Sequence, residues 1–243
     1  MLSKQMAAVL ALLGGDGARE RSAGLADAAA AAAAAALGVD GIAAGMGTGP
    51  EGVVLAWGQQ ETSAALEDAQ FTLGQGPCVE AVAAGTPILI PDLAAAAARW
   101  SAFTPAAAAL GVCALFAFPL QIGAISVGVL LAHRSTTGPM SPQQLADALG
   151  LADAVTALLV HYASPGSDSA DALPGAPHPG GAVPATYRAQ VHQATGMISV
   201  QLDVSLAEAL ARLRAHAYAQ DRLVADVAAD VVTRRLRFHR SDP

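Results

Sequence analysis

The sequence predicts an α+β protein in which a sheet-and-helix region precedes a small helical one. Strand-like apolar runs alternate with helical periodicity up to about residue 162, and only helical periodicity follows residue 185. Residues 163–184 between them are rich in proline, glycine and serine. We therefore expect two domains, 1–162 and 185–243, joined by a flexible linker.

The first region begins with helices and continues with strands. An amphipathic pattern predicts a helix near the N-terminus, and residues 23–37 predict an alanine-rich second helix. Strands are expected at 41–47 and 53–57. The stretch GTGPEG (47–52) matches Gly-x-Gly-x-x-Gly, but a strand and not a helix follows it. It therefore predicts a hairpin turn and no dinucleotide site.

Further along, the proline positions help to place the elements. TPILIPDL (86–93) predicts a short strand that its two prolines restrict to an edge or a strand end. Residues 111–134 predict a hairpin of two apolar strands that turns near Ile122 and Gly123. Residues 141–163 predict a helix capped by a serine, with a proline at its first position. These strands predict one antiparallel sheet with helices on it.

The C-terminal region predicts a three-helix bundle. Its first helix covers residues 185–201, Ser205 caps a second that ends near 219, and Asp221 caps a third that ends near 238.

Charge and composition exclude several functions. The net charge of −7 argues against a chain that coats nucleic acid along its length. However, residues 185–243 hold eight of the thirteen basic residues against six acids, which suggests a separate task for this part. Lys4 is the sole lysine, so no phosphate-binding Walker loop can form. Two cysteines without metal spacing and no membrane-length apolar run predict a cytoplasmic protein without metal or cofactor.

Candidate chemistry in the first region centres on FTLGQGPCVEAV (71–82). Pro77 suits the first position of a helix, which places Cys78 in the first turn, where unpaired amides lower the pKa of a thiol. The pattern nevertheless favours a small buried apolar residue at this position over a reactive thiol. The scarce aromatic residues either form the core or line a small-molecule pocket. The candidate ligand-binding residues are Trp57, Phe71, Pro77, Cys78, Trp100 and Phe103.

In the helical region, the basic residues differ in how well helix geometry explains them. Glu208 and Arg212 are four residues apart, so they predict a pair that stabilises the helix by about 0.2–0.5 kcal/mol. Arg214 points in another direction and has no such explanation. Gly196 costs its helix roughly 1 kcal/mol relative to alanine, which suggests a packing or contact role.

The stretch VHQATGMISVQLDVSLAEALARLRAHAYAQDRLVADVAADVV resembles the ANTAR domain, a three-helix RNA-binding module of bacterial transcription antiterminators. The resemblance covers roughly residues 185–238 without a gap. The matching positions are Ala194, Gly196, Ala209, Leu213, Arg214, Val227 and Ala228.

The resemblance implies a dimer that binds a pair of RNA hairpins in the nascent transcript and prevents an overlapping terminator from forming. Arginine and stacking rings suit hairpin loops. The expected RNA contacts are Arg188, His192, Thr195, Gly196, Arg212, Arg214, His216 and Tyr218. Position 195 is commonly basic in this family, so threonine there removes one phosphate contact.

The first domain resembles the GAF domain, a sensory α+β module that binds small ligands. The resemblance lies in GQGPCVEAVAAGTPILIPDL, the Trp100 region and the hairpin FAFPLQIGAISVGVLLAHR. The order of the two modules is similar to that of actinobacterial regulators. Because the chain has no asparagine, the signature of cyclic-nucleotide-binding members is absent, and the ligand stays open. The expected function is a non-enzymatic, ligand- or dimerisation-controlled antiterminator.

Two alternatives come from other classes of protein. The C-terminal helices form a protein–protein module in the first, and Cys78 serves a thiol enzyme in the second. DNA binding through a helix-turn-helix is a further variant of the nucleic-acid hypothesis.

Overall fold

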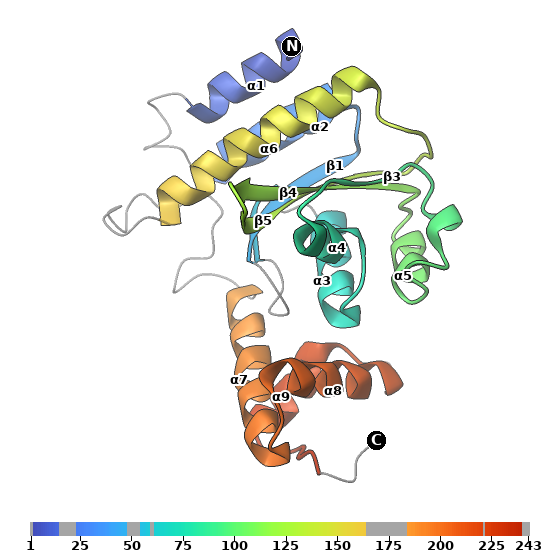
Figure 1. Cartoon of the computed structure of the whole chain (residues 1–243), viewed down its shortest axis with the longest axis vertical. Coiled ribbons are helices and arrows are strands. Elements are labelled where there is room, and N and C mark those ends of the chain that lie inside the picture. Colours follow the sequence, from blue (N-terminus) through green and yellow to red (C-terminus); the bar gives the residue numbers. More distant parts are fainter. Residues whose placement is uncertain are drawn as a thin grey trace. The chain divides into compact units, whose positions relative to one another are not determined.

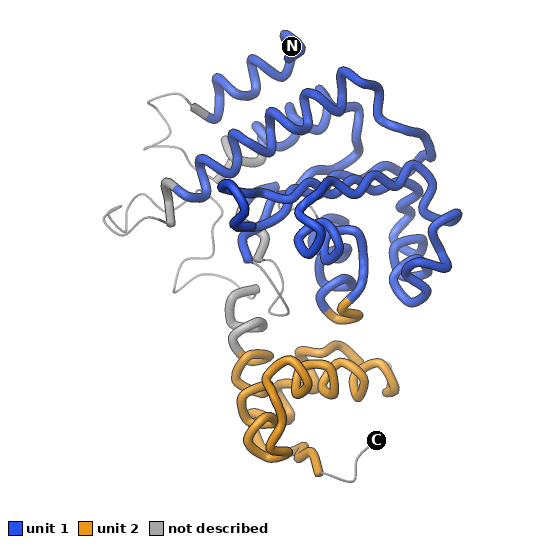
Figure 2. Tube along the Cα trace, viewed as in Figure 1, with its two compact units in different colours: residues 1–71, 75–176 blue, residues 72–74, 177–243 orange. Residues whose placement is uncertain are grey.

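The computed structural model describes residues 2–14, 23–47, 54–58, 61–163, 184–220 and 222–239. The chain divides into two compact units (Figure 2). Residues 1–71 and 75–176 form the first, which we call the sheet unit, and residues 72–74 and 177–243 form the second, the helical unit. The predicted linker at 163–184 lies almost wholly outside the described residues.

The sheet unit is built on an antiparallel sheet with the strand order β2-β1-β5-β4-β3 (Figure 1). The strands are β1 (Gly41–Met46), β2 (Val54–Trp57), β3 (Ile88–Ile90), β4 (Ala114–Ile122) and β5 (Ile125–Arg134). The predicted antiparallel sheet is confirmed, and the proline-flanked strand lies at its edge as expected. Most of the turn predicted at 47–52 lies outside the described residues.

Strands β4 and β5 form the centre of the sheet and are buried on both faces. The hairpin turns at Gly123, whose φ of +59° is a left-handed conformation that glycine adopts without strain. All residues from Ala114 to Phe118 are buried. Because successive side chains of a strand point to opposite faces, such a strand needs helices on both sides of the sheet.

One face is covered by α2 (Ala23–Leu37) and α6 (Pro142–Ala163), and α1 (Lys4–Gly14) packs against these two helices (Figure 1). Alanines supply many of the helical contacts in this core, and Phe116, Phe118 and Trp57 fill it from the sheet. Arg134 closes its edge, since its guanidinium lies over the Phe116 ring and donates to the carbonyl of Gly38 just beyond α2.

Helix α4 (Pro77–Ala84) packs against the other face, and α3 (Glu61–Leu73) and α5 (Phe103–Ala109) lie on the same side of the sheet, with a short 3₁₀ turn, η3 (Ala94–Ala96), before α5. No sequence pattern predicted α3. The buried side of this helix mixes Leu66 and Phe71 with three polar residues, Ser63, Glu67 and Gln70, so its apolar stripe is interrupted.

The helical unit consists of α7 (Pro184–Leu202), α8 (Leu206–Ala219) and α9 (Val224–Val232). The cap at Ser205 is confirmed, because its hydroxyl accepts a hydrogen bond from the amide of Glu208 at 3.2 Å. None of the helices in the described residues is long and apolar enough to cross a membrane.

The predicted bounds of the third helix were wrong at both ends. It begins at Val224 with Leu223 as its cap, and Asp221 lies outside the described residues. It ends at Val232, because Arg234 adopts a φ of +60°, a left-handed conformation that stops a helix. Residues 233–239, which we call the C-terminal segment, then fold back until Phe238 is buried.

Gly128→Ala should destabilise the sheet unit by about 2–3 kcal/mol, because a Cβ at this position would lie 2.0 Å from the carbonyl oxygen of Gly45 on β1. Urea denaturation measures the change in the free energy of unfolding. The control is Gly150→Ala on α6, where the added carbon meets the flexible Leu2 side chain and raises helix propensity. Equal stability of the two variants would contradict the strand contact.

Candidate functional site

A cluster of polar side chains lies buried beneath the sheet, on the face covered by α3 and α4. Ser63, Glu67 and Gln70 follow one another at spacings of four and three residues, so they share one side of α3. They are 0%, 3% and 0% exposed. Together with Cys78 at the start of α4 we call them the polar cluster.

Gln70 joins the two helices of the polar cluster. Its Oε1 accepts a hydrogen bond of 2.7 Å from the amide of Cys78, which is one of the unpaired amides at the start of α4. Gly76 makes this approach possible, because its φ is +142° and a Cβ there would lie 2.5 Å from the Gln70 side chain. The sequence GQGPC therefore encodes a turn that lets a glutamine reach the helix terminus.

The thiol of Cys78 does not have the lowered pKa that its place in the first turn of a helix suggested. Burial raises its pKa well above the usual value, the charge of Glu67 raises it further, and the hydrogen bond with Gln70 opposes this shift. The group is therefore a neutral thiol, the form that is neither nucleophile nor metal ligand. Within the described residues no cluster of three or more histidine, cysteine or acidic side chains could hold a metal ion.

The six predicted ligand-binding residues do not gather in one place. Five belong to the elements on the polar-cluster side of the sheet: Phe71 on α3, Pro77 and Cys78 on α4, Trp100 before α5, and Phe103 at its start. All five are buried. Trp57, in contrast, belongs to the core beneath α2 and α6. Sequence patterns missed Ser63, Glu67 and Gln70, whose periodicity is helical but polar.

The polar cluster offers hydrogen-bonding groups in apolar surroundings. Ser63 Oγ and Gln70 Nε2 make no hydrogen bond with any described residue. A buried polar group without a partner costs about 1–3 kcal/mol, which a bound molecule would recover. An amide, a hydroxyl and a carboxylate together suit a small polar ligand.

In the helical unit, two of the predicted RNA contacts have structural roles. Thr195 is 6% exposed, and its hydroxyl donates to the carbonyl of Val191 at 2.7 Å, so this side chain faces the bundle core. His216 packs against the Phe238 ring, with 5.1 Å between the ring centroids, and its Nε2 lies 2.8 Å from the side-chain amide of Gln220.

The other predicted RNA contacts are more accessible. His192 and Tyr218 are exposed, and the predicted ion pair of Arg212 with Glu208 forms at 2.9 Å. Arg214 is half-buried, and this burial lowers the pKa of a guanidinium that stays charged at neutral pH. The Arg188 side chain lies outside the described residues.

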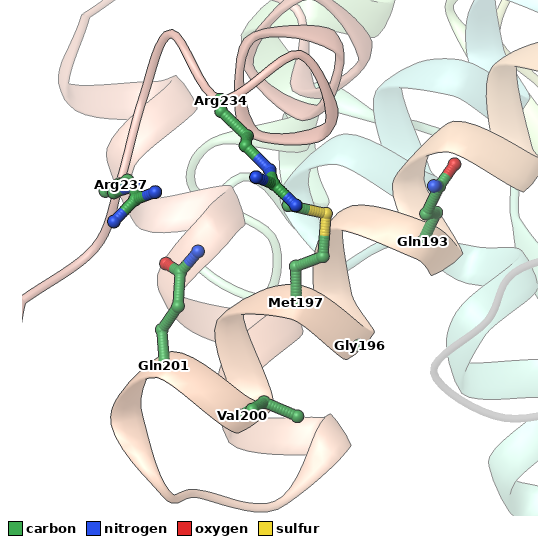
Figure 3. A pocket seen from close by; sticks show the side chains of 7 residues that line it. All are labelled: Gln193, Gly196, Met197, Val200, Gln201, Arg234 and Arg237. Carbon is green, nitrogen blue, oxygen red and sulfur yellow. The ribbon is translucent and has the colours of Figure 1, made fainter.

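A groove that no sequence pattern predicted runs along α7 beside the C-terminal segment (Figure 3). Its volume is about 570 Å³. The lining residues are Gln193, Gly196, Met197, Val200, Gln201, Arg234 and Arg237. The one signal in the sequence is Gly196, since a Cβ there would meet no atom within 4 Å and the glycine has no packing role in the described chain.

Comparison with protein-family models matches residues 23–159 to the GAF domain. Among solved structures, the GAF domain from an Acinetobacter phosphoenolpyruvate-protein phosphotransferase is 11% identical with a TM-score of 0.50, and the match covers 68% of this chain and 95% of that one. At this identity the likeness shows the fold alone. No curated protein matches the sequence.

Two further structures are similar at lower TM-scores. The GAF domain from a Coxiella burnetii phosphoenolpyruvate-protein phosphotransferase is 17% identical, with a TM-score of 0.46 and coverage of 65% of this chain and 96% of that one. The phycocyanobilin-bound GAF domain from a cyanobacterial phytochrome is 15% identical, with a TM-score of 0.48 and coverage of 66% and 96%.

Cys78 should resist alkylation in the native protein, because a buried neutral thiol reacts when the unit opens and not before. Iodoacetamide labelling at pH 8, resolved by peptide mass spectrometry, should be at least ~100-fold slower than labelling in urea. The half-buried Cys113 serves as the internal comparison. Rapid native labelling of Cys78 at pH 7 would restore the thiol-enzyme alternative.

Gly196→Ala should stabilise the helical unit by about 0.4–1 kcal/mol, because the position is helical and the added methyl group enters open space. Thermal and urea denaturation test this. Gly111→Ala is the contrasting variant, since its surroundings are equally open but its φ is +77°, and it should lose about 1 kcal/mol. Destabilisation by Gly196→Ala would indicate a packing role.

Proposed function

Because the chain belongs to the GAF domain family of ligand-binding and signalling domains, we propose that it is a regulator with a GAF sensor and an RNA-binding helical unit. Its output in this proposal is transcription antitermination through paired RNA hairpins, as the ANTAR resemblance implies. The protein acts as a homodimer and not as an enzyme.

The burial of the five apolar positions among the seven that match the ANTAR pattern is the observation that carries this proposal. The five apolar ones, Ala194, Ala209, Leu213, Val227 and Ala228, are each 0% exposed. Gly196 and Arg214 are half-buried and stand outside this core. Five positions of the pattern therefore form the core of a three-helix bundle, as the ANTAR resemblance implies, and the glycine and the arginine lie at the edge of this core.

The distribution of charge supports the same proposal. The last 59 residues hold most of the basic residues in an acidic chain, so attraction to phosphates is confined to the helical unit. A dimer would bring two such units to two hairpins. Joining two weak sites in this way raises the overall affinity without new contacts.

The sensor role assigned to the sheet unit rests on its polar cluster. A small ligand that satisfies Ser63 and Gln70 would also act on Cys78 and the start of α4, because Gln70 bonds that helix. The proposed signal is therefore a change in the position of α4 relative to α3. Equal RNA affinity with and without such a ligand would contradict ligand control.

A protein–protein module is the second candidate function. The apolar side chains of Leu206, Tyr218 and Leu223 are 59%, 67% and 59% exposed on the helical unit. Exposed apolar groups favour a protein partner. The salt dependence of the affinity distinguishes the two candidates. Added salt weakens binding through phosphate contacts, whereas it does not weaken binding through buried apolar surface.

The full-length protein should bind a paired-hairpin RNA with an affinity that falls steeply with salt. Each phosphate contact contributes about 0.7 to the slope of log K against log salt concentration. Arg214→Ala should weaken binding about tenfold and lower this slope by about 0.7. Fluorescence anisotropy at several salt concentrations measures both quantities, and circular dichroism verifies the fold.

The matched control is Arg99→Ala, which removes the same charge from the sheet unit, where Arg99 pairs with Glu80. It should leave RNA binding unchanged. If the folded protein binds no hairpin RNA at low salt, the antitermination proposal fails. Salt-insensitive association with a protein would favour the second candidate.

A further inference from the structure

The groove beside α7 combines charged, amide and apolar groups in one surface (Figure 3). Arg234 and Arg237 approach it from the C-terminal segment, whereas Gln193, Met197 and Gln201 belong to α7. Figure 3 shows the Arg234 side chain reaching toward Met197 and Arg237 on the same side as Gln201. No acidic residue is among those that line the groove.

The two arginines of the groove differ from Arg212, Arg222 and Arg235 because no acidic side chain of the described residues neutralises their charge. Arg212 pairs with Glu208, while Arg222 and Arg235 both pair with Asp230. The guanidinium groups of Arg234 and Arg237 have no ion pair or hydrogen bond with any residue that the structure describes. The groove therefore carries two positive charges that no described residue compensates.

Both ends of the segment that carries these arginines are fixed. At one end, the amide of Arg235 donates to the carbonyl of Asp230 at 2.7 Å, and Arg234 holds its left-handed conformation. At the other end, Phe238 is buried and its amide donates to Gln201 Oε1 at 3.1 Å. The backbone that carries the two arginines is thus fixed, which lowers the backbone entropy lost when an anion binds.

The α7 side of the groove allows close approach. Gly196 leaves open space above the helix where any other residue would place a Cβ. Met197 is half-buried and Val200 is 84% exposed, so apolar surface lies next to the cations. Phosphate beside apolar surface is the chemistry of a nucleotide, in which a charged backbone alternates with ribose and base.

We infer that this groove holds the sugar–phosphate backbone of the bound RNA, with phosphates on Arg234 and Arg237 and the apolar part of a nucleotide on Met197 and Val200. The inference rests on the proposed RNA-binding function and adds to it a contact surface outside the positions of the ANTAR pattern, except for Gly196. Loss of these contacts should lower the affinity for RNAs of every sequence by the same factor, because phosphates carry no sequence information.

The test is a titration of full-length protein with paired-hairpin RNA, comparing wild type with Arg234→Gly, Arg237→Ala and their combination. Arg234→Gly removes the charge and also places glycine at a left-handed position, so its melting temperature should not fall. Each single variant should weaken binding about tenfold, and the combination should lower the salt slope by about 1.4. Gly196→Ala should weaken binding despite its more stable helix.

The matched control is Arg235→Ala, which removes the same charge from the same segment but does not line the groove. It should bind RNA within about twofold of wild type after its weak ion pair is lost. If wild type binds and the groove variants bind equally well, this inference is overturned while the proposed function stands. If wild type binds no RNA at low salt, both are overturned. If Arg235→Ala loses as much RNA affinity as the groove variants, RNA is attracted by the overall charge of the segment and not by the groove, and the inference is overturned.

Discussion

The pairing of β4 with β5 is the contact on which the sheet unit depends. These strands occupy the interior of the sheet, and their side chains are buried on both faces. One helical layer cannot cover both faces of such a hairpin, so α2 and α6 cover one face while α4 covers the other, with α3 bonded to α4 through Gln70. The two faces therefore differ in the side chains that pack against them. The α2 and α6 side is an alanine-rich core, whereas the α3 and α4 side contains the polar cluster.

This division explains why a candidate ligand site occurs on one face and not the other. Helices packed through alanine approach the sheet closely and leave little room for polar groups. On the opposite face, Gln70 uses its amide to bond the start of α4, and the glycine turn at Gly76 accommodates it. The same arrangement buries Cys78 and keeps its thiol protonated. A local pattern that suggested a reactive cysteine therefore marks the connection between two helices.

Sequence patterns predicted the elements whose determinants are local. The apolar hairpin at 111–134, the serine cap of α8 and the Glu208–Arg212 pair required no distant residue. Helix α3 was missed because polar residues interrupt the apolar stripe on its buried side. The end of α9 was misplaced because a left-handed arginine stops it where glycine would be expected. Thr195 was assigned to the RNA surface, but the helical rotation places it in the core and leaves Gly196 beside it in the groove. The groove itself joins residues near 197 to residues near 235, which no local pattern relates.

The alanine content of the first core has a thermal consequence. A methyl group removes little apolar surface from water, and apolar surface exposed on unfolding is what raises the heat capacity of the denatured chain. Typical domains gain about 12–15 cal/mol/K per residue on unfolding. A core in which α2 contributes Ala29, Ala30, Ala33 and Ala34 should gain less. Its stability curve is then flatter, so the sheet unit would keep a nearly constant margin of stability over a wide span of temperatures.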